Sequence, residues 1–152
     1  MSDNASILAI AVAQIDRDEG CVLTAYPDPL SGGDPYTIGW GSTGDDIGPG
    51  TVWTQAEADA RRDCDLQDIL TSLDARLAWW RNLDAPRAAV LVNMAYELGV
   101  GGLLEFHEML AAVRADQWAT AAADMGFSRW EKQVPKREGR LAAQMLTGTI
   151  QS

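Results

Sequence analysis

Residues 19–41 read EGCVLTAYPDPLSGGDPYTIGWG, and they hold two short segments separated by a stretch rich in proline and glycine. Residues 22–26 and 36–40 each alternate in the manner of a strand with one buried face. The prolines and glycines at positions 27, 29, 32, 33 and 35 favour a wide loop between them. The stretch therefore predicts a β-hairpin.

The segments on both sides of this hairpin are predicted to be helical. Apolar residues recur at helical spacing over residues 7–15, and Gly20 ends that helix. Downstream, Thr54 and Glu57 have the spacing of a capping box, and no glycine or proline follows before about residue 80. A helix of about 25 residues is roughly 37 Å long. This second helix is therefore long enough to connect two lobes.

Further helices follow to the end of the chain. Asp84 and Pro86 mark the start of one helix, and Pro135 and Gly148 mark the start and end of the last. These elements predict a mainly α (α+β) protein with a small β-hairpin lobe and a larger helical lobe joined by the long helix. We expect one domain over residues 1–152. Its N-terminal lobe lies at about 12–60 and its connecting helix at about 54–80; the helical lobe takes about 81–152 plus the first helix.

Composition excludes several functional classes. The 152 residues are 47% hydrophobic, enough for one compact core. No apolar run approaches the ~20 residues of a membrane span. Residues 1–4 carry one acidic residue, Asp3, and no basic one, so they do not resemble the basic start of a secretory signal. The two cysteines form no CxxC pair and His107 is the single histidine, so we expect no metal and no cofactor. A net charge of −10 argues against nucleic acid as a partner.

Two carboxylates near the hairpin are candidate catalytic groups. Glu19 lies in the last turn of the first helix, where the helix dipole and the neighbouring Asp18 favour the protonated carboxyl that a general acid needs. Asp28 lies between Pro27 and Pro29, which restrict its backbone. Paired carboxylates carry out glycoside hydrolysis. Taken singly, each residue also fits an ordinary solvated helix end or turn.

The same region resembles the catalytic region of the phage-T4-type lysozymes. In that family eight residues separate a glutamate from an aspartate or cysteine, and five more residues separate the latter from a threonine. The matching residues are Glu19-Gly20, Leu23, Tyr26, Asp28 and the run YTIGWG at 36–41. The resemblance continues at 83–85, 92–94, 98–99 and 128–149, so it covers nearly the whole chain. It implies a lysozyme-like fold and a muramidase. Such an enzyme cleaves the β-1,4 bond between N-acetylmuramic acid and N-acetylglucosamine with inversion, in wall degradation or host lysis.

The resemblance also implies a role for each site residue. Glu19 would protonate the leaving oxygen, Asp28 would hold or activate the attacking water, and Thr37 would orient that water. Arg137 resembles the family arginine that pairs with the catalytic glutamate, although the residues alone would place it on the surface. The candidate substrate-binding residues are Tyr26, Glu97, Phe106 and Arg129.

The loop of the hairpin departs from the family pattern. Eight residues, not five, separate Asp28 from Thr37, and the segment Gly32-Gly33-Asp34 looks like an insertion. Asp34 is therefore a second candidate carboxylate. We expect Asp28 to be the functional one, because it keeps the family spacing from Glu19 and the two prolines beside it limit its freedom.

The partner implied by the resemblance is bacterial peptidoglycan. We expect a monomer that is made in the host cytoplasm without a signal peptide, does not insert into membranes, and reaches the wall through a separate membrane-permeabilising protein. Two other functions remain open. A lytic transglycosylase needs the acid but no positioned water, so Asp28 and Thr37 favour the hydrolase. A non-catalytic wall-binding or virion module would not need Glu19.

Overall fold

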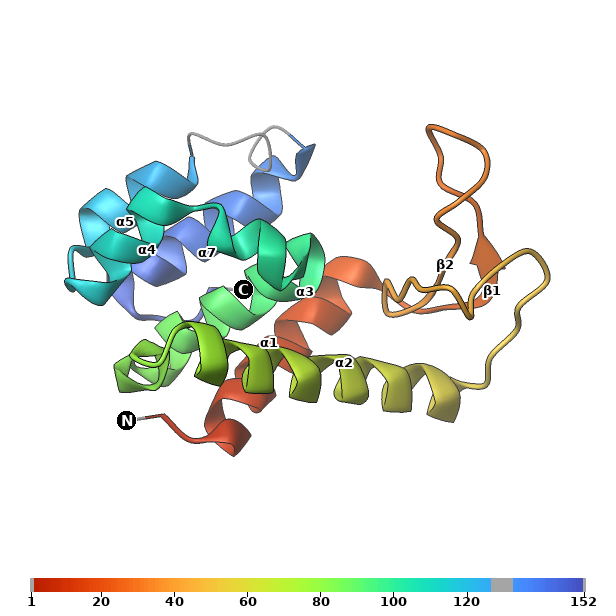
Figure 1. Ribbon diagram of the computed structural model, residues 1–152, viewed down its shortest axis with the longest axis horizontal. Helices are drawn as coiled ribbons and strands as arrows, with labels where there is room; N and C mark the ends of the chain where they lie inside the picture. Colours follow the sequence, from red (N-terminus) through yellow and green to blue (C-terminus); the bar gives the residue numbers. More distant parts are fainter. Residues whose placement is uncertain (1, 127–132, 152) are drawn as a thin grey trace. The chain divides into compact units, whose positions relative to one another are not determined.

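The computed structural model describes residues 2–126 and 133–151. It divides into two compact units (Figure 1). We call residues 15–68 the β unit, and residues 1–14 together with 69–152 the helical unit. Helices α1 (Asn4–Glu19) and α2 (Gln55–Arg76) each contribute residues to both units. The predicted mainly α fold with a small β-hairpin is confirmed.

The β unit contains the predicted hairpin. Strands β1 (Val22–Tyr26) and β2 (Thr37–Gly39) are antiparallel, with Val22 opposite Gly39 and Tyr26 opposite Thr37. The second strand is shorter than predicted, because the chain turns immediately after Gly39. Residues 51–53 run along the other side of β1 through two backbone hydrogen bonds of 2.9 Å. Both edges of β1 are thus hydrogen-bonded.

Helix α2 begins at the predicted capping box. The Glu57 amide donates to Thr54 Oγ1 at 3.1 Å, and the Thr54 amide donates to Glu57 Oε1 at 3.4 Å. The helix ends at Arg76, four residues before its predicted end. A 3₁₀ turn over Trp80–Asn82 follows, in which the Trp80 ring is fully buried and its indole donates to Asp74. The tight turn buries one of two adjacent tryptophans, which a regular helix would direct to different faces.

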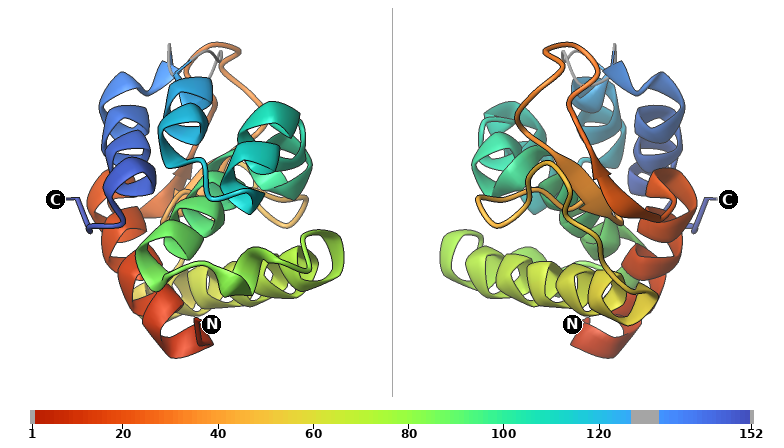
Figure 2. Two further views of the ribbon diagram at one scale, coloured as in Figure 1. Left: turned by 90° about the vertical axis from the view of Figure 1, so that its left-hand side faces the viewer. Right: turned by 90° about the vertical axis from the view of Figure 1, so that its right-hand side faces the viewer.

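The helical unit is built around α3 (Ala85–Leu104), whose residues 88–95 are all buried. Asp84 caps this helix as predicted, and the chain kinks at Gly99, where φ is +77°. Helices α4 (His107–Arg114), α5 (Trp118–Met125) and α7 (Pro135–Thr147) follow. Helix α5 packs against both α4 and α7, and α7 also packs against α3 (Figure 2).

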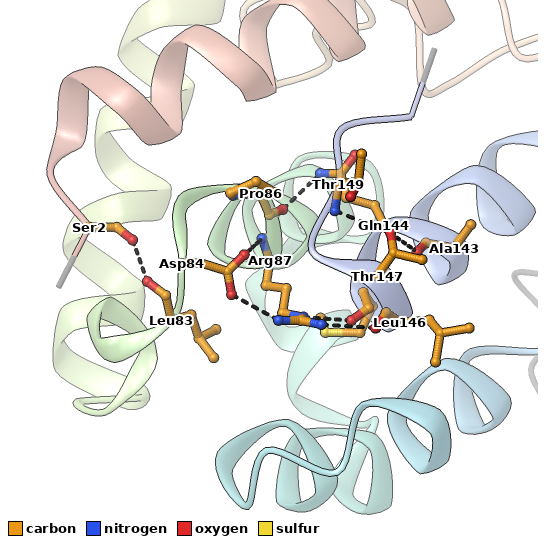
Figure 3. Close-up of polar contacts among 11 residues, drawn as sticks. Ser2, Leu83, Asp84, Pro86, Arg87, Ala143, Gln144, Leu146, Thr147 and Thr149 are labelled. Carbon is orange, nitrogen blue, oxygen red and sulfur yellow. Dashed lines mark hydrogen bonds and ion pairs between the residues drawn. The ribbon is translucent and has the colours of Figure 1, made fainter.

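Arg87 ties the end of α7 to the start of α3 (Figure 3). Its guanidinium donates to the carbonyl oxygens of Met145 and Leu146 at 2.7 and 2.8 Å, and also to Asp84. The same group lies 4.0 Å from the centre of the Trp118 ring. These contacts satisfy carbonyl groups that a helix end leaves without a partner, and Gly148, with φ +68°, completes the C-terminal cap.

No single described helix has the length and apolar character needed to cross a membrane. The pair formed by α3 and α4 meets that requirement only when the two are taken together, and they are bent by 104° at their junction.

Candidate active site

Glu19 is the last residue of α1, and its carboxyl group lies against the backbone of Gly41. A Cβ atom placed on Gly41 would be 2.7 Å from Glu19 Oε2 and 2.9 Å from its Cδ. Any larger residue at position 41 would therefore meet this carboxyl group. Gly20, with φ +65°, ends α1, and its amide donates to the carbonyl of Asp16 at 3.1 Å. Glu19 is thus held between a helix end and a glycine, and it is half-buried.

The turn after β2 brings Gly41 back beside that strand. Ile38 and Ser42 exchange two backbone hydrogen bonds, of 3.0 and 2.8 Å, so residues 39–41 reverse the chain direction. Gly39 and Gly41 both have positive φ, +66° and +85°, which glycine adopts without steric cost. The carboxyl group of Glu19 therefore lies against the turn that follows β2.

Asp28 starts the hairpin loop and is fixed by it. Its Oδ2 accepts hydrogen bonds from the amides of Leu30 and Ser31, at 3.2 and 2.9 Å. Its own amide donates to the carbonyl of Gly33 at 2.9 Å, and its carbonyl accepts from the amide of Gly32 at 2.8 Å. A turn aspartate that binds its own loop in this way has little freedom. Among the described residues no hydrogen bond reaches Oδ1 of this half-buried side chain.

Asp28 and Thr37 lie at the same end of the hairpin. Tyr26 is paired with Thr37 in the sheet, and Asp28 follows Tyr26 by two residues. Two residues of extended chain span at most about 7 Å. Tyr26 itself is 41% exposed. All three predicted groups therefore belong to the β unit: Asp28 and Thr37 lie at the loop end of the hairpin, and Glu19 lies at the end of α1 against Gly41.

The inserted segment participates in holding Asp28. Gly32 and Gly33 supply the backbone groups that bond to the Asp28 main chain, and the Ser31 hydroxyl donates to the carbonyl of Asp34 at 3.1 Å. The residue Asp34 is exposed. The geometry therefore favours Asp28 over Asp34 as the rigidly held carboxylate, and which of them acts in catalysis stays a prediction.

Arg137 lies in the first turn of α7, in the helical unit, and is 7% exposed. The surface position that the residues alone suggest is wrong. Arg137 shares the buried face of α7 with Glu138, Leu141, Gln144 and Met145. Its Nη1 lies 3.1 Å from Oε2 of Glu97, with side chains that are 8% and 18% exposed. A buried cation needs such a carboxylate partner.

Asn93 precedes Glu97 by one helical turn on α3 and is fully buried. In the described part of the chain, neither polar atom of its side chain has a hydrogen-bond partner. Buried amides are normally satisfied, so this one is a candidate for binding a water or a ligand group. The resemblance includes Asn93 but assigns it no role. The sequence feature that could have identified it is an asparagine within an otherwise apolar helix.

The other predicted residues are distributed as follows. Phe106 is half-buried and immediately precedes α4. Arg129 lies outside the described residues. Glu19 and Arg137 belong to different units, so their pairing stays a prediction. Over residues 2–126 and 133–151, no group of three or more His, Cys, Asp or Glu side chains could hold a metal ion.

Comparisons with known proteins agree with the resemblance. The phage lysozyme family model matches residues 16–147. The chain is 30% identical over 102 residues to probable T4-type lysozyme 1 of Dictyostelium discoideum, covering 65% of this chain and 60% of that protein. It is 40% identical over 86 residues to the endolysin of Lactococcus phage c2, covering 56% and 36%.

A third relative is the pre-baseplate central spike protein Gp5 of Enterobacteria phage T4. It is 32% identical over 107 residues, which is 68% of this chain and 18% of that protein. The chain therefore matches less than two thirds of the length of each of these relatives.

Proposed function

Because the chain belongs to the phage lysozyme family, we propose that it is a peptidoglycan hydrolase of the muramidase type. It cleaves the β-1,4 bond between N-acetylmuramic acid and N-acetylglucosamine. One observation carries this proposal: the carboxyl group of Glu19 lies against Gly41, in the turn that follows the strand of Thr37. A second carboxylate, Asp28, is held rigidly in the loop between the two strands of the same hairpin. Two positioned carboxyl groups are what glycoside hydrolysis requires.

In the proposed reaction Glu19 donates its proton to the glycosidic oxygen as the bond to the anomeric carbon breaks. A water molecule held by Asp28 Oδ1 and the Thr37 hydroxyl attacks the opposite face of that carbon and gives its proton to Asp28. The product then has the inverted, α configuration. Exchange with solvent returns Glu19 to the acid form and Asp28 to the carboxylate. The resemblance assigns Arg137 a supporting role and makes Tyr26, Glu97, Phe106 and Arg129 the candidate residues for binding the sugar chain.

A non-catalytic virion module is the second candidate function. The observation that favours it is the match to a phage spike protein. In that setting Glu19 would be dispensable. Substitution of Glu19 therefore distinguishes the two functions.

The experiment that tests the proposal is clearing of permeabilised bacterial cells, followed as loss of turbidity. The wild-type protein is expected to clear the suspension, and Glu19→Gln to fold normally and lose at least ~100-fold in rate, because an amide has no acidic proton to donate. Glu57→Gln is the matched control, since Glu57 lies at the capping box of α2. An inactive wild type, or a Glu19→Gln variant with more than about a tenth of wild-type rate, would contradict the proposal.

A further inference from the structure

Arg61 and Arg62 are adjacent in α2, and each lies over a tryptophan ring while pairing with aspartates. The guanidinium of Arg61 is 5.8 Å from the centre of the Trp53 ring, and that of Arg62 is 5.5 Å from the centre of the Trp40 ring. The two arginines differ in what they connect. Arg61 donates to Asp46 at 2.8 Å and to a loop carbonyl at 2.9 Å, so it secures the segment before α2.

Arg62 connects α2 to the last turn of α1. Its Nη1 donates to both carboxylate oxygens of Asp16, at 2.8 and 2.7 Å. Asp16 lies three residues before Glu19, and its carbonyl accepts the hydrogen bond from Gly20 that ends the helix. The Arg62 side chain is only 11% exposed. The Asp16 side chain is 29% exposed, so the ion pair is partly shielded from solvent and salt.

The same arginine also lies over the residue that precedes Gly41. The Trp40 indole donates to Oδ1 of Asp59 at 2.8 Å, which fixes the ring plane against α2. Gly41 is the next residue, and it forms the surface on which the Glu19 carboxyl lies. One guanidinium thus contacts both structures that hold Glu19, the helix end through Asp16 and the turn through Trp40.

We propose that Arg62 is a positioning residue for Glu19, fixing the last turn of α1 against the turn at Gly41. The inference rests on the proposed function, in which Glu19 is the general acid. A guanidinium suits the role because its edge donates to a carboxylate while its face stacks on an aromatic ring. A lysine would keep the charge and lose the planar stacking. Active-site groups tolerate displacement of only about 0.5 Å.

The test compares Arg62→Met and Arg62→Lys with Arg61→Met, which removes the same side chain type from the same helix. Hydrolysis of a soluble peptidoglycan fragment gives kcat and KM, and a thermal melt gives the folded fraction. Arg62→Met is expected to lower kcat about 10- to 100-fold with KM changed less than about threefold, because a misplaced catalytic group is costly. Arg62→Lys is expected to recover part of that kcat. Arg61→Met should stay within about threefold of wild type.

A spectroscopic readout separates this inference from the proposed function. The amide resonance of Gly41 in a ¹⁵N correlation spectrum reports on the carboxyl group beside it. It should move in Glu19→Gln and in Arg62→Met, and stay in place in Arg61→Met. An inactive wild type with this resonance pattern would refute the proposed function alone. Equal loss of kcat in both Met variants, an unchanged Gly41 resonance in folded Arg62→Met, or a kcat of Arg62→Lys no higher than that of Arg62→Met, would overturn the positioning role.

Discussion

Replacing Gly41 by alanine should displace the Glu19 carboxyl group. The new Cβ would lie 2.7 Å from Oε2, and ordinary van der Waals contact begins at 3.4 Å, so this oxygen must move by about 0.7 Å. That shift exceeds the tolerance of about 0.5 Å for a working site. A misplacement of about 1 Å costs roughly 10²-fold in rate. We therefore expect Gly41→Ala to lose 10- to 100-fold in kcat.

The backbone cost of this substitution can be isolated with Gly50→Ala. Gly50 has φ +84°, against +85° for Gly41, so an alanine is strained to a similar degree at both positions, by about 1–2 kcal/mol. Apart from its two chain neighbours, no residue has a heavy atom within 4 Å of a Cβ on Gly50. The melting temperatures of the two variants should therefore fall by similar amounts, while kcat falls in Gly41→Ala alone. A Gly41→Ala enzyme with kcat within about threefold of Gly50→Ala would refute the contact between Gly41 and Glu19.

Three further predictions concern charged groups. Asp28→Asn should lose at least ~10-fold in rate while Asp34→Asn stays within a few-fold, since a positioned base contributes ~10²-fold or more; the reverse ranking would assign catalysis to the inserted aspartate. Arg137→Ala should lower activity and also destabilise the fold by about 1–3 kcal/mol in urea unfolding, because it removes a buried guanidinium and its ion pair with the half-buried Glu97; an unchanged urea midpoint would contradict this. The pKa of Asp74 is lowered from 3.8, mainly by its hydrogen bond from Arg81. Its stabilisation is therefore present above pH 3.8 and is lost as the pH falls through the folded-state pKa. Asp74→Asn should lower Tm at pH 6, and the Tm difference from wild type should shrink as the pH falls below 3.8; a difference that does not shrink on acidification would exclude this linkage.

The elements that local chemistry determines could be predicted from the sequence. The hairpin follows from alternating residues on both sides of a loop rich in proline and glycine, and the start of α2 follows from a capping box that spans four residues. The rigidity of Asp28 follows partly from the prolines beside it. The remaining part of that rigidity comes from hydrogen bonds with the inserted glycines, which no spacing rule specifies.

The features that depend on distant contacts could not be predicted. Arg137 is buried because Glu97, forty positions earlier, provides its counter-charge. The role of Gly41 depends on a positive φ together with the approach of a side chain from another element. Arg62 stands in a row of charged residues on α2, and nothing in that row distinguishes it from Arg61. In each case the residue type is visible in the sequence, but the residue that it contacts is known only from the folded structure.

Hydrolysis of purified peptidoglycan in ¹⁸O-labelled water, followed by mass spectrometry of the released fragments, tests the central claim most directly. A muramidase that uses a water molecule positioned by Asp28 and Thr37 should give fragments whose reducing N-acetylmuramic acid carries one ¹⁸O atom. Glu19→Gln should release none above background. Fragments ending in an anhydro sugar without ¹⁸O, or no release by the wild-type protein, would contradict the account.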